Sequence, residues 1–398
     1  MLRIKSGKRI YEGVEVQSYD PSLIVIKLNN GYNIGFRRDK VEIERLEDTD
    51  GGMQKREREA IGGTYDVSIL GTGGTIASYV DYSTGAVHPA RSTSELLRFM
   101  PEIKSIARVG ARVLFSVFSE NMRCEHWKRI AQEVKEELDA GAKGVVVTHG
   151  TDTLCYTASA LAFMLPQIGG PVVLTGAQRS TDRPSSDGFL NLMASTRLAL
   201  TDLGEVTIAM HAGSSDDSVA VHRATRTRKM HTSARSAFQT IGSAPLGYVR
   251  NDGIELTEHR KKADETVIDA RMDEGVTLLY FYPGMRTEIL DAVTERSSGV
   301  VIAGTGLGHV SDDLIESIEA CGKPVCIVSQ CINGSTNLNV YATGRKLLNA
   351  GAIPCADMLP ETACVKLMWV LGHTKDRDEV AGLMQRNIAG EICDRRSL

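Results

Sequence analysis

The chain has 398 residues, of which 42% are hydrophobic and 24% charged, a composition ordinary for a soluble globular protein. Its 46 basic and 50 acidic residues give a net charge of −4, so no global positive field would attract nucleic acid. This length predicts two or three domains. Because the sequence has neither an apolar signal-peptide core nor a run of about 18 apolar residues, we expect a cytoplasmic protein without a membrane span.

The first 48 residues carry the signals of short strands. An apolar stretch at Leu23 to Leu28 precedes the turn signal Asn29-Asn30-Gly31, and alternating residues occur at Val14 to Val16 and Val41 to Glu44. Short strands joined by hairpins predict a small antiparallel β-barrel over residues 1–48. Residues 49–63 are rich in charge and glycine, and we expect them to form a linker.

From Tyr65 onward, apolar β-branched runs alternate with helical patterns, which predicts a parallel sheet covered by helices on both faces. We place this first α/β domain at residues 64–255. Its expected strands are Val67–Leu70, Val113–Val117, Gly144–Thr148, Pro171–Thr175 and Val206–His211. Its expected helices are Glu125–Ala140, Thr153–Leu165 and Gly188–Asp202.

A polar stretch from Asn251 to Thr266 separates this pattern from a second one, and we place the connection between domains at residues 256–266. A second α/β domain is expected over residues 267–398. Its expected strands are Thr277–Tyr282, Gly299–Ala303 and Pro324–Val328, and its expected helices are Thr287–Arg296, Asp312–Cys321 and Thr362–Leu371.

The eight cysteines follow no metal-finger spacing, and Cys321 and Cys326 flank a predicted strand instead of forming a CxxC pair. We therefore expect reduced thiols and no metal site.

Two glycine-flanked turns each carry a threonine directly after an apolar, β-branched run. Thr75 lies in the sequence GGTIA (residues 73–77), and Thr151 lies in HGTDT (residues 149–153) beside Asp152. Glycine allows a sharp turn and close approach of a ligand, and ligands of open α/β sheets bind at the carboxyl ends of the strands. We therefore expect both hydroxyls and the carboxylate to meet in one crevice, where a hydroxyl attacks a carbonyl group.

The order of these motifs resembles that of the bacterial-type L-asparaginase family of amidohydrolases. Besides GGTIA and HGTDT, the matching segments are YSTG at 82–85, SENM at 119–122, VLTGA at 173–177 and SDG at 186–188. The resemblance covers about residues 65 to 373 and implies the two-domain α/β fold of that family.

The resemblance also implies a role for each matching residue. Thr75 would be the nucleophile and Tyr82 its hydrogen-bonding partner, while Thr151, Asp152 and Lys229 would form a second catalytic group. Ser119, Glu120 and Asp152 would hold the amino-acid head group, and Ala177 would line the pocket. The scheme is attack on a side-chain amide, loss of ammonia and hydrolysis of the acyl-enzyme. Two points stay open: which threonine attacks first, and whether Lys229 is a neutral base or a charged group that orients Thr151.

The N-terminal barrel and Glu120, where many simple asparaginases have glutamine, point to a narrower resemblance. A barrel fused to this amidase core resembles the D subunits of archaeal glutamyl-tRNA(Gln) amidotransferases. This implies that glutamine is the substrate and that ammonia passes to a partner, the E subunit, which amidates Glu-tRNA(Gln). It further implies no cofactor in this chain, ATP and magnesium on the partner, tRNA bound mainly by the partner, and a homodimer within a heterotetramer.

Three other interpretations remain. The first is a stand-alone L-asparaginase with an accessory N-terminal domain, the second a non-catalytic amide sensor, and the third a nucleic-acid scaffold built on the barrel. The balanced charge of the barrel argues against the third. We expect His149 to make a structural hydrogen bond, with a general-base role as the alternative. We expect the basic run from His222 to Arg235 to be a solvated face, with a contact to RNA phosphates as the alternative.

Overall fold

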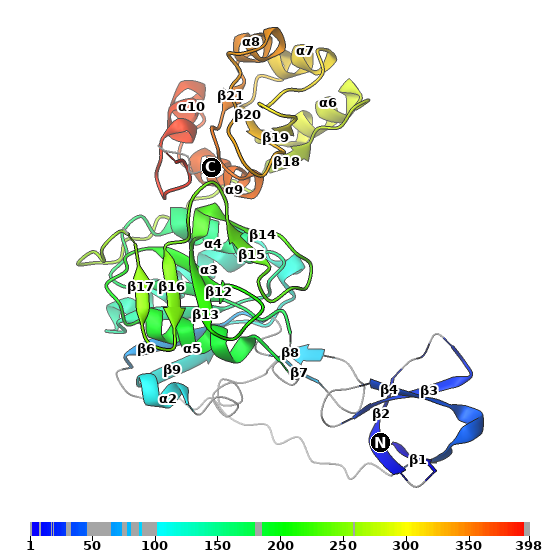
Figure 1. Cartoon of the computed structure of the whole chain (residues 1–398). Coiled ribbons are helices and arrows are strands. Elements are labelled where there is room, and N and C mark those ends of the chain that lie inside the picture. Colours follow the sequence, from blue (N-terminus) through cyan, green and yellow to red (C-terminus); the bar gives the residue numbers. More distant parts are fainter. Residues whose placement is uncertain are drawn as a thin grey trace.

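The computed structural model describes residues 2–7, 9–16, 18, 20–28, 33–45, 65–73, 78–80, 87–89, 102–179, 185–257 and 259–393. The predicted linker at 49–63, together with Thr75 and Tyr82, lies outside these residues. Figure 1 shows the described elements in three groups along the chain: blue N-terminal strands, a cyan and green domain with the largest sheet, and a yellow to red C-terminal domain.

The described N-terminal residues form a five-stranded antiparallel sheet with the order β4-β3-β2-β1-β5. Its strands are β1 (Leu2–Ser6), β2 (Arg9–Val16), β3 (Leu23–Leu28), β4 (Asn33–Arg37) and β5 (Glu42–Arg45), and a short 3-10 turn, η1 (Arg38–Lys40), joins the last two. Leu2, Ile4, Ile24 and Ile26 are buried at period-two positions and form its core. The prediction of antiparallel strands is confirmed, although β1 was missed. Among the described strands no ladder joins β4 to β5, so a closed barrel stays a prediction.

The first α/β domain is built on a sheet that has eight strands within the described residues, in the order β17-β16-β13-β12-β11-β10-β6-β9. Its parallel strands are β6 (Val67–Gly71), β9 (Val109–Val113), β10 (Gly144–Thr148), β11 (Val172–Thr175) and β12 (Val206–His211). Three antiparallel strands extend one side: β13 (Ser218–Arg223), β16 (Gly247–Arg250) and β17 (Ile254–Leu256).

Helices cover both faces of this sheet, as the alternating pattern predicted. On β10, Val145 and Val147 belong to a core cluster that includes α3 (Cys124–Asp139) and α4 (Leu154–Met164). Val146, between them, belongs to the cluster of the opposite face, with residues of α5 (Gly188–Leu198) and α2 (Ile103–Ile106). The sheet is therefore buried on both sides, which explains its nearly continuous apolar strands.

One strand prediction in this domain was wrong. A strand was expected at 113–117, but the observed strand β9 ends at Val113, because β9 is an edge strand whose glycine and arginine hide the pattern. Residues 254–256, in the polar stretch that begins at Asn251, form β17, which was not predicted. Two further two-stranded sheets were not predicted: β7 (Ser78–Val80) with β8 (Val87–Pro89), and β14 (Thr227–Lys229) with β15 (Phe238–Thr240).

The C-terminal domain has a parallel sheet that contains four strands among the described residues. These are β18 (Val276–Tyr280), β19 (Gly299–Gly304), β20 (Val325–Ser329) and β21 (Ile353–Pro354). One face packs on α6 (Thr287–Arg296), α7 (Asp313–Ala320) and α8 (Ala342–Asn349). The other packs on α9 (Pro360–Leu371) and α10 (Arg377–Gln385). The α/β pattern is confirmed, whereas α8, α10 and β21 were missed.

Helix α9 also ties the two domains together. Val365 and Met368 join the core of the first domain, and Thr362 hydrogen-bonds Ser159 on α4 with 3.2 Å between their hydroxyl oxygens. Along the described part of the chain, no helix is both long and apolar enough to cross a membrane.

Candidate functional site

The two threonine-bearing turns begin on adjacent parallel strands. In the register of β6 with β10, Gly71 lies opposite Thr148, and both the amide and the hydroxyl of Thr72 donate to the Thr148 carbonyl, at 3.1 and 2.9 Å. Gly73 has φ of +111°, and a Cβ there would meet the Val117 carbonyl oxygen at 2.5 Å, so only glycine fits. Because Thr75 is outside the described residues, its meeting with Thr151 stays a prediction.

The second predicted group is assembled. The Lys229 ammonium nitrogen lies 2.8 Å from the Thr151 hydroxyl oxygen and 2.8 Å from an Asp152 carboxylate oxygen. Thr151 is buried, and the Lys229 side chain is only 13% exposed, whereas the Asp152 carboxylate is 70% exposed. One nitrogen therefore bridges an inward-facing hydroxyl and a carboxylate that remains open to a ligand.

Lys229 reaches this position from a small hairpin, not from the central sheet. It ends β14, pairs with Phe238 of β15, and is followed by a hydrogen bond from the Met230 amide to the Ala237 carbonyl at 2.6 Å. Phe238 is buried in the core of the first domain, which fixes the base of the hairpin. Lys229 and Thr151 are 78 residues apart in sequence, so only the tertiary fold brings them together.

The predicted head-group residues lie on the neighbouring loop. Ser119 and Glu120 form the 3-10 turn η3 (Ser119–Asn121), and the Thr153 hydroxyl donates to the Ser119 carbonyl at 2.6 Å. Ser119 is buried and Glu120 is exposed. This loop is thus attached to the HGTDT turn. The contact of Ser119 and Glu120 with a substrate remains a prediction.

Ala177 follows β11 and is fully buried. A Cβ built on the preceding Gly176 would lie 2.9 Å from the Thr151 methyl group, so this turn packs directly against Thr151. The carboxylate of Asp187 holds the same turn by accepting from the amides of Gln178, at 3.0 Å, and Arg179, at 2.9 Å. Asp187 is therefore a residue that supports this turn.

His149 has the structural role that was expected. Its Nδ1 lies 2.7 Å from the Gly150 carbonyl, and its Nε2 lies 2.8 Å from the Thr157 hydroxyl, which in turn accepts from the Trp127 indole at 3.0 Å. Complete burial lowers the pKa of His149 to about 4, so the ring is neutral at neutral pH. Both ring nitrogens are therefore engaged in hydrogen bonds within the protein.

The interpretation of the basic run as a solvated face was wrong. His222 and Arg226 are buried, and the Arg235 side chain is 13% exposed. Arg228 contacts Glu361 at 3.5 Å, and burial raises the pKa of this carboxyl on α9. The guanidinium groups of this run therefore pair with other groups of the protein instead of facing solvent. The small residues between the basic ones in HRATRTRK could have suggested this.

The assembled groups suit hydroxyl chemistry. A lysine nitrogen at hydrogen-bond distance can activate or orient the Thr151 hydroxyl, and backbone amides of the adjoining turns can stabilise an oxyanion. All eight cysteines lie in described segments, and each thiol is free. Within those segments, no three His, Cys, Asp or Glu side chains are grouped so that they could hold a metal ion.

Comparisons with known proteins first define the class. Residues 66–262 match the family model of the asparaginase N-terminal domain, and residues 275–384 match that of the glutaminase/asparaginase C-terminal domain. The thermostable L-asparaginase from Thermococcus kodakarensis is 34% identical with a TM-score of 0.75, covering 83% of this chain and 99% of its own. L-asparaginase I from Vibrio cholerae is 27% identical with a TM-score of 0.72, covering 83% of this chain and 100% of its own. The core is therefore an asparaginase-type amidohydrolase fold.

Relatives similar over the whole chain narrow the assignment. Residues 1–46 match the family model described as the GatD N-terminal domain. The D subunit of the glutamyl-tRNA(Gln) amidotransferase from Pyrococcus furiosus is 48% identical over 98% of this chain and 93% of its own length. The D subunit from Saccharolobus solfataricus is 46% identical over 100% of this chain and 93% of its own. The chain belongs to the D-subunit family of glutamyl-tRNA(Gln) amidotransferases.

Proposed function

We propose that this chain is the ammonia-producing subunit of a tRNA-dependent amidotransferase. It hydrolyses the side-chain amide of glutamine, and a partner subunit uses the ammonia to convert Glu-tRNA(Gln) to Gln-tRNA(Gln). In this proposal the partner is the E subunit, which binds ATP, magnesium and most of the tRNA. The chain itself needs no cofactor and works in the cytoplasm as a homodimer within a heterotetramer.

The observation that carries the proposal is the match of the N-terminal residues. The solved asparaginases are covered almost completely, yet they account for only 83% of this chain. The segment at 1–46 matches the domain named after the D subunit, and the D-subunit relative from Pyrococcus furiosus covers 98% of this chain. A stand-alone asparaginase would not need this additional domain.

The geometry supports the amidase half of the proposal. Lys229 bridges Thr151 and Asp152, and the loops of Ser119 and Ala177 pack around the same turn. We assign Thr75 as the nucleophile with Tyr82 as its partner, Thr151, Asp152 and Lys229 as the second group, and Ser119, Glu120 and Ala177 as the walls of the amino-acid pocket. An exposed carboxylate at Asp152 suits the ammonium group of a free amino acid.

The test is to co-express the full chain with the candidate partner and measure ammonia release from glutamine with and without Glu-tRNA(Gln). The proposal predicts a stable complex, glutamine-dependent formation of Gln-tRNA(Gln), and loss of both activities in Thr75→Val. Rapid asparagine hydrolysis by the isolated chain, unchanged by the partner and by tRNA, would instead establish a stand-alone asparaginase. Absence of ammonia release under all of these conditions would indicate a sensor.

A further inference from the structure

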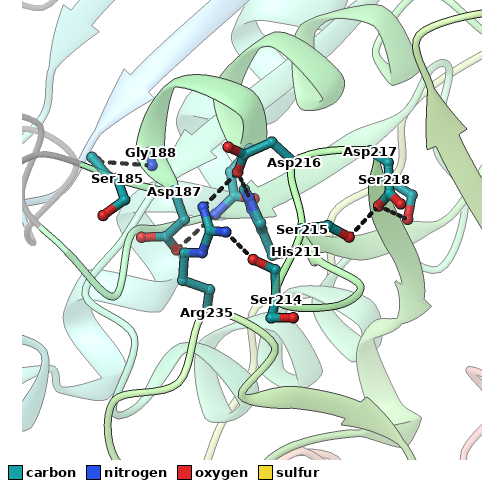
Figure 2. A network of polar contacts seen from close by, with 12 residues as sticks. Ser185, Asp187, Gly188, His211, Ser214, Ser215, Asp216, Asp217, Ser218 and Arg235 are labelled. Carbon is teal, nitrogen blue, oxygen red and sulfur yellow. Dashed lines mark hydrogen bonds and ion pairs between the residues drawn. The ribbon is translucent and has the colours of Figure 1, made fainter.

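A continuous series of polar contacts runs from the turn behind Thr151 to the hairpin that carries Lys229. It begins at Asn191 on α5, whose amide nitrogen donates to the Gly176 carbonyl at 3.0 Å and to Asp187 at 3.1 Å. It continues through His211, at the end of β12, and Asp216 to Arg235, and Figure 2 shows these three side chains close together. The amidase chemistry described above uses none of these four residues.

The orientation of each group in this series is fixed by its neighbours. Both partners of the Asn191 amide nitrogen are acceptors, so the Asn191 amide oxygen must face His211 and accept from its Nδ1 at 2.7 Å. Nε2 of His211 then lies 3.2 Å from Oδ1 of Asp216, another acceptor. His211 therefore links the Asn191 amide oxygen to the Asp216 carboxylate.

Asp216 is the point at which the side chains of His211 and Arg235 converge. Its Oδ1 also accepts from Arg235 at 2.5 Å, and Arg235 donates further to the Ser214 carbonyl (Figure 2). The hydrogen bonds from His211 and Arg235 hold the pKa of Asp216 below its usual value, so it is ionised at neutral pH. The Asp216 side chain is 71% exposed, although its partners His211 and Arg235 are 0% and 13% exposed.

Arg235 lies in the loop at 230–237, which directly follows Lys229. The hairpin is therefore tethered at two places: at its end by Lys229 to Thr151 and Asp152, and on its loop by Arg235 to Asp216. Both tethers lead back to one turn, because Gly176 packs on Thr151 and also accepts from Asn191. The contacts thus form a closed series that leads from Gly176 through Thr151, Lys229 and the hairpin loop and returns through Asp216 to Gly176.

We propose that Asn191, His211, Asp216 and Arg235 are positioning residues that set the distance between Lys229 and Thr151 by fixing the loop of the Lys229 hairpin. This inference rests on the proposed function, because it assumes that Lys229 activates or orients the hydroxyl. Among the described residues, no hydrogen bond joins these four side chains to Thr151, Asp152 or Lys229. Loosening the loop leaves Lys229 present but displaced, and small displacements of a reactive group lower the rate of chemistry more than the binding of substrate.

The test uses the full chain in complex with its partner and measures kcat and KM for ammonia release from glutamine. Asp216→Ala and Arg235→Ala are expected to lower kcat roughly tenfold while KM stays within about twofold. Arg235→Lys, which keeps a cation facing Asp216, is expected to recover most of the lost rate. Asp217→Ala is the matched control, because the neighbouring Asp217 hydrogen-bonds Ser215 and Ser218 instead of Arg235, and this variant is expected to leave kcat unchanged.

A second measurement separates positioning from a general loss of structure. In the Lys229→Ala background, Arg235→Ala should cause no further loss, since it acts through Lys229. The rate at which a diazoketone analogue of glutamine alkylates the site provides the same comparison when turnover is slow. Wild-type kcat in Asp216→Ala and Arg235→Ala, or an equal further loss in the Lys229→Ala background, overturns the inference while leaving the amidase function intact. Full activity of Lys229→Ala itself would overturn the assigned role of Lys229 and the inference with it.

Discussion

Two cations on one short segment form ion pairs that differ in burial, and this difference distinguishes a structural pair from a pair in the candidate site. Arg226 and Asp357 lie 3.0 Å apart, and their side chains are 1% and 4% exposed. Lys229 follows Arg226 by three residues and lies 2.8 Å from Asp152, and the side chains of this second pair are 13% and 70% exposed. The distances are almost equal. The first pair is closed to solvent and fixes the contact between domains, and the second keeps a carboxylate open to a ligand.

The partners of each cation reinforce this difference. Besides Asp357, the Arg226 guanidinium donates to the backbone carbonyls of Ile241, at 2.6 Å, and Glu391, at 2.9 Å. Its Nη1 also donates to the Asp357 backbone carbonyl at 3.0 Å, so this cation is held mainly by backbone groups. Lys229 instead donates to the buried Thr151 hydroxyl and to the exposed carboxylate of Asp152. A buried pair holds one arrangement, while a half-exposed pair can exchange partners during a reaction.

The largest expected effect is on activity, at the half-exposed pair. Thr151→Val keeps the shape of the side chain but removes the hydroxyl that faces Lys229. We expect the rate of ammonia release from glutamine to fall about 10⁴-fold, as when one member of a nucleophile and base group is removed. The urea midpoint should stay near that of the wild type. A variant that retained even one tenth of the activity would contradict the assigned role of Thr151.

The next largest effect is on stability, at the buried pair. Arg226→Ala leaves Asp357 and several carbonyls without their partner, and we expect the free energy of unfolding to fall by about 3–5 kcal/mol. Urea unfolding measures this change. The matched control is Arg108→Ala, because Arg108 lies at the same 3.0 Å from Asp66 but is 69% exposed. A similar loss in both variants would mean that burial does not distinguish the pairs.

The fold was readable from the sequence wherever strands are buried on both faces. Continuous apolar runs at Gly144–Thr148 and Val206–His211 match β10 and β12 residue for residue. The pattern failed at sheet edges, where β9 and β17 carry polar residues because one side faces solvent. An edge strand is stabilised by its backbone hydrogen bonds to the neighbouring strand. The residues of that neighbour lie elsewhere in the sequence, so a local pattern does not reveal the pairing.

The site was readable where its residues form local motifs. The HGTDT motif predicted Thr151 and Asp152, and the family resemblance predicted Lys229. The Lys229 nitrogen lies 2.8 Å from the Thr151 hydroxyl and 2.8 Å from an Asp152 carboxylate oxygen, while their catalytic roles stay predictions. The supporting series of polar contacts was not found, because Asn191, His211 and Arg235 are distant in sequence and converge only through the sheet. A charge run also does not reveal which guanidinium is buried, since burial depends on partners such as Asp357.

A third, smaller effect concerns pH. Burial lowers the pKa of His149 and of His222 to about 4, below the ordinary value of 6.5. The unfolded chain therefore binds more protons between these pH values, and stability is fully present above about pH 6.5 and lost as the pH falls toward 4. The loss is on the order of 3 kcal/mol for each histidine. Urea unfolding of His149→Gln at several pH values should show a shallower dependence than the wild type, and an unchanged slope would contradict the buried neutral ring.

The smallest effect on stability is expected at Asp152, where a loss of substrate binding without a loss of stability would distinguish the exposed pair from the buried one. Asp152→Asn removes the charge of a carboxylate that is 70% exposed, and exposed ion pairs contribute less than about 1 kcal/mol, so the free energy of unfolding should hardly change. The amide oxygen can still accept from Lys229. If the carboxylate binds the ammonium group of glutamine, however, the KM for glutamine should rise about tenfold, because a charge-assisted hydrogen bond is lost. Steady-state kinetics and urea unfolding of one preparation measure both quantities, and a stability loss as large as that of Arg226→Ala would show that the exposed pair also holds the fold.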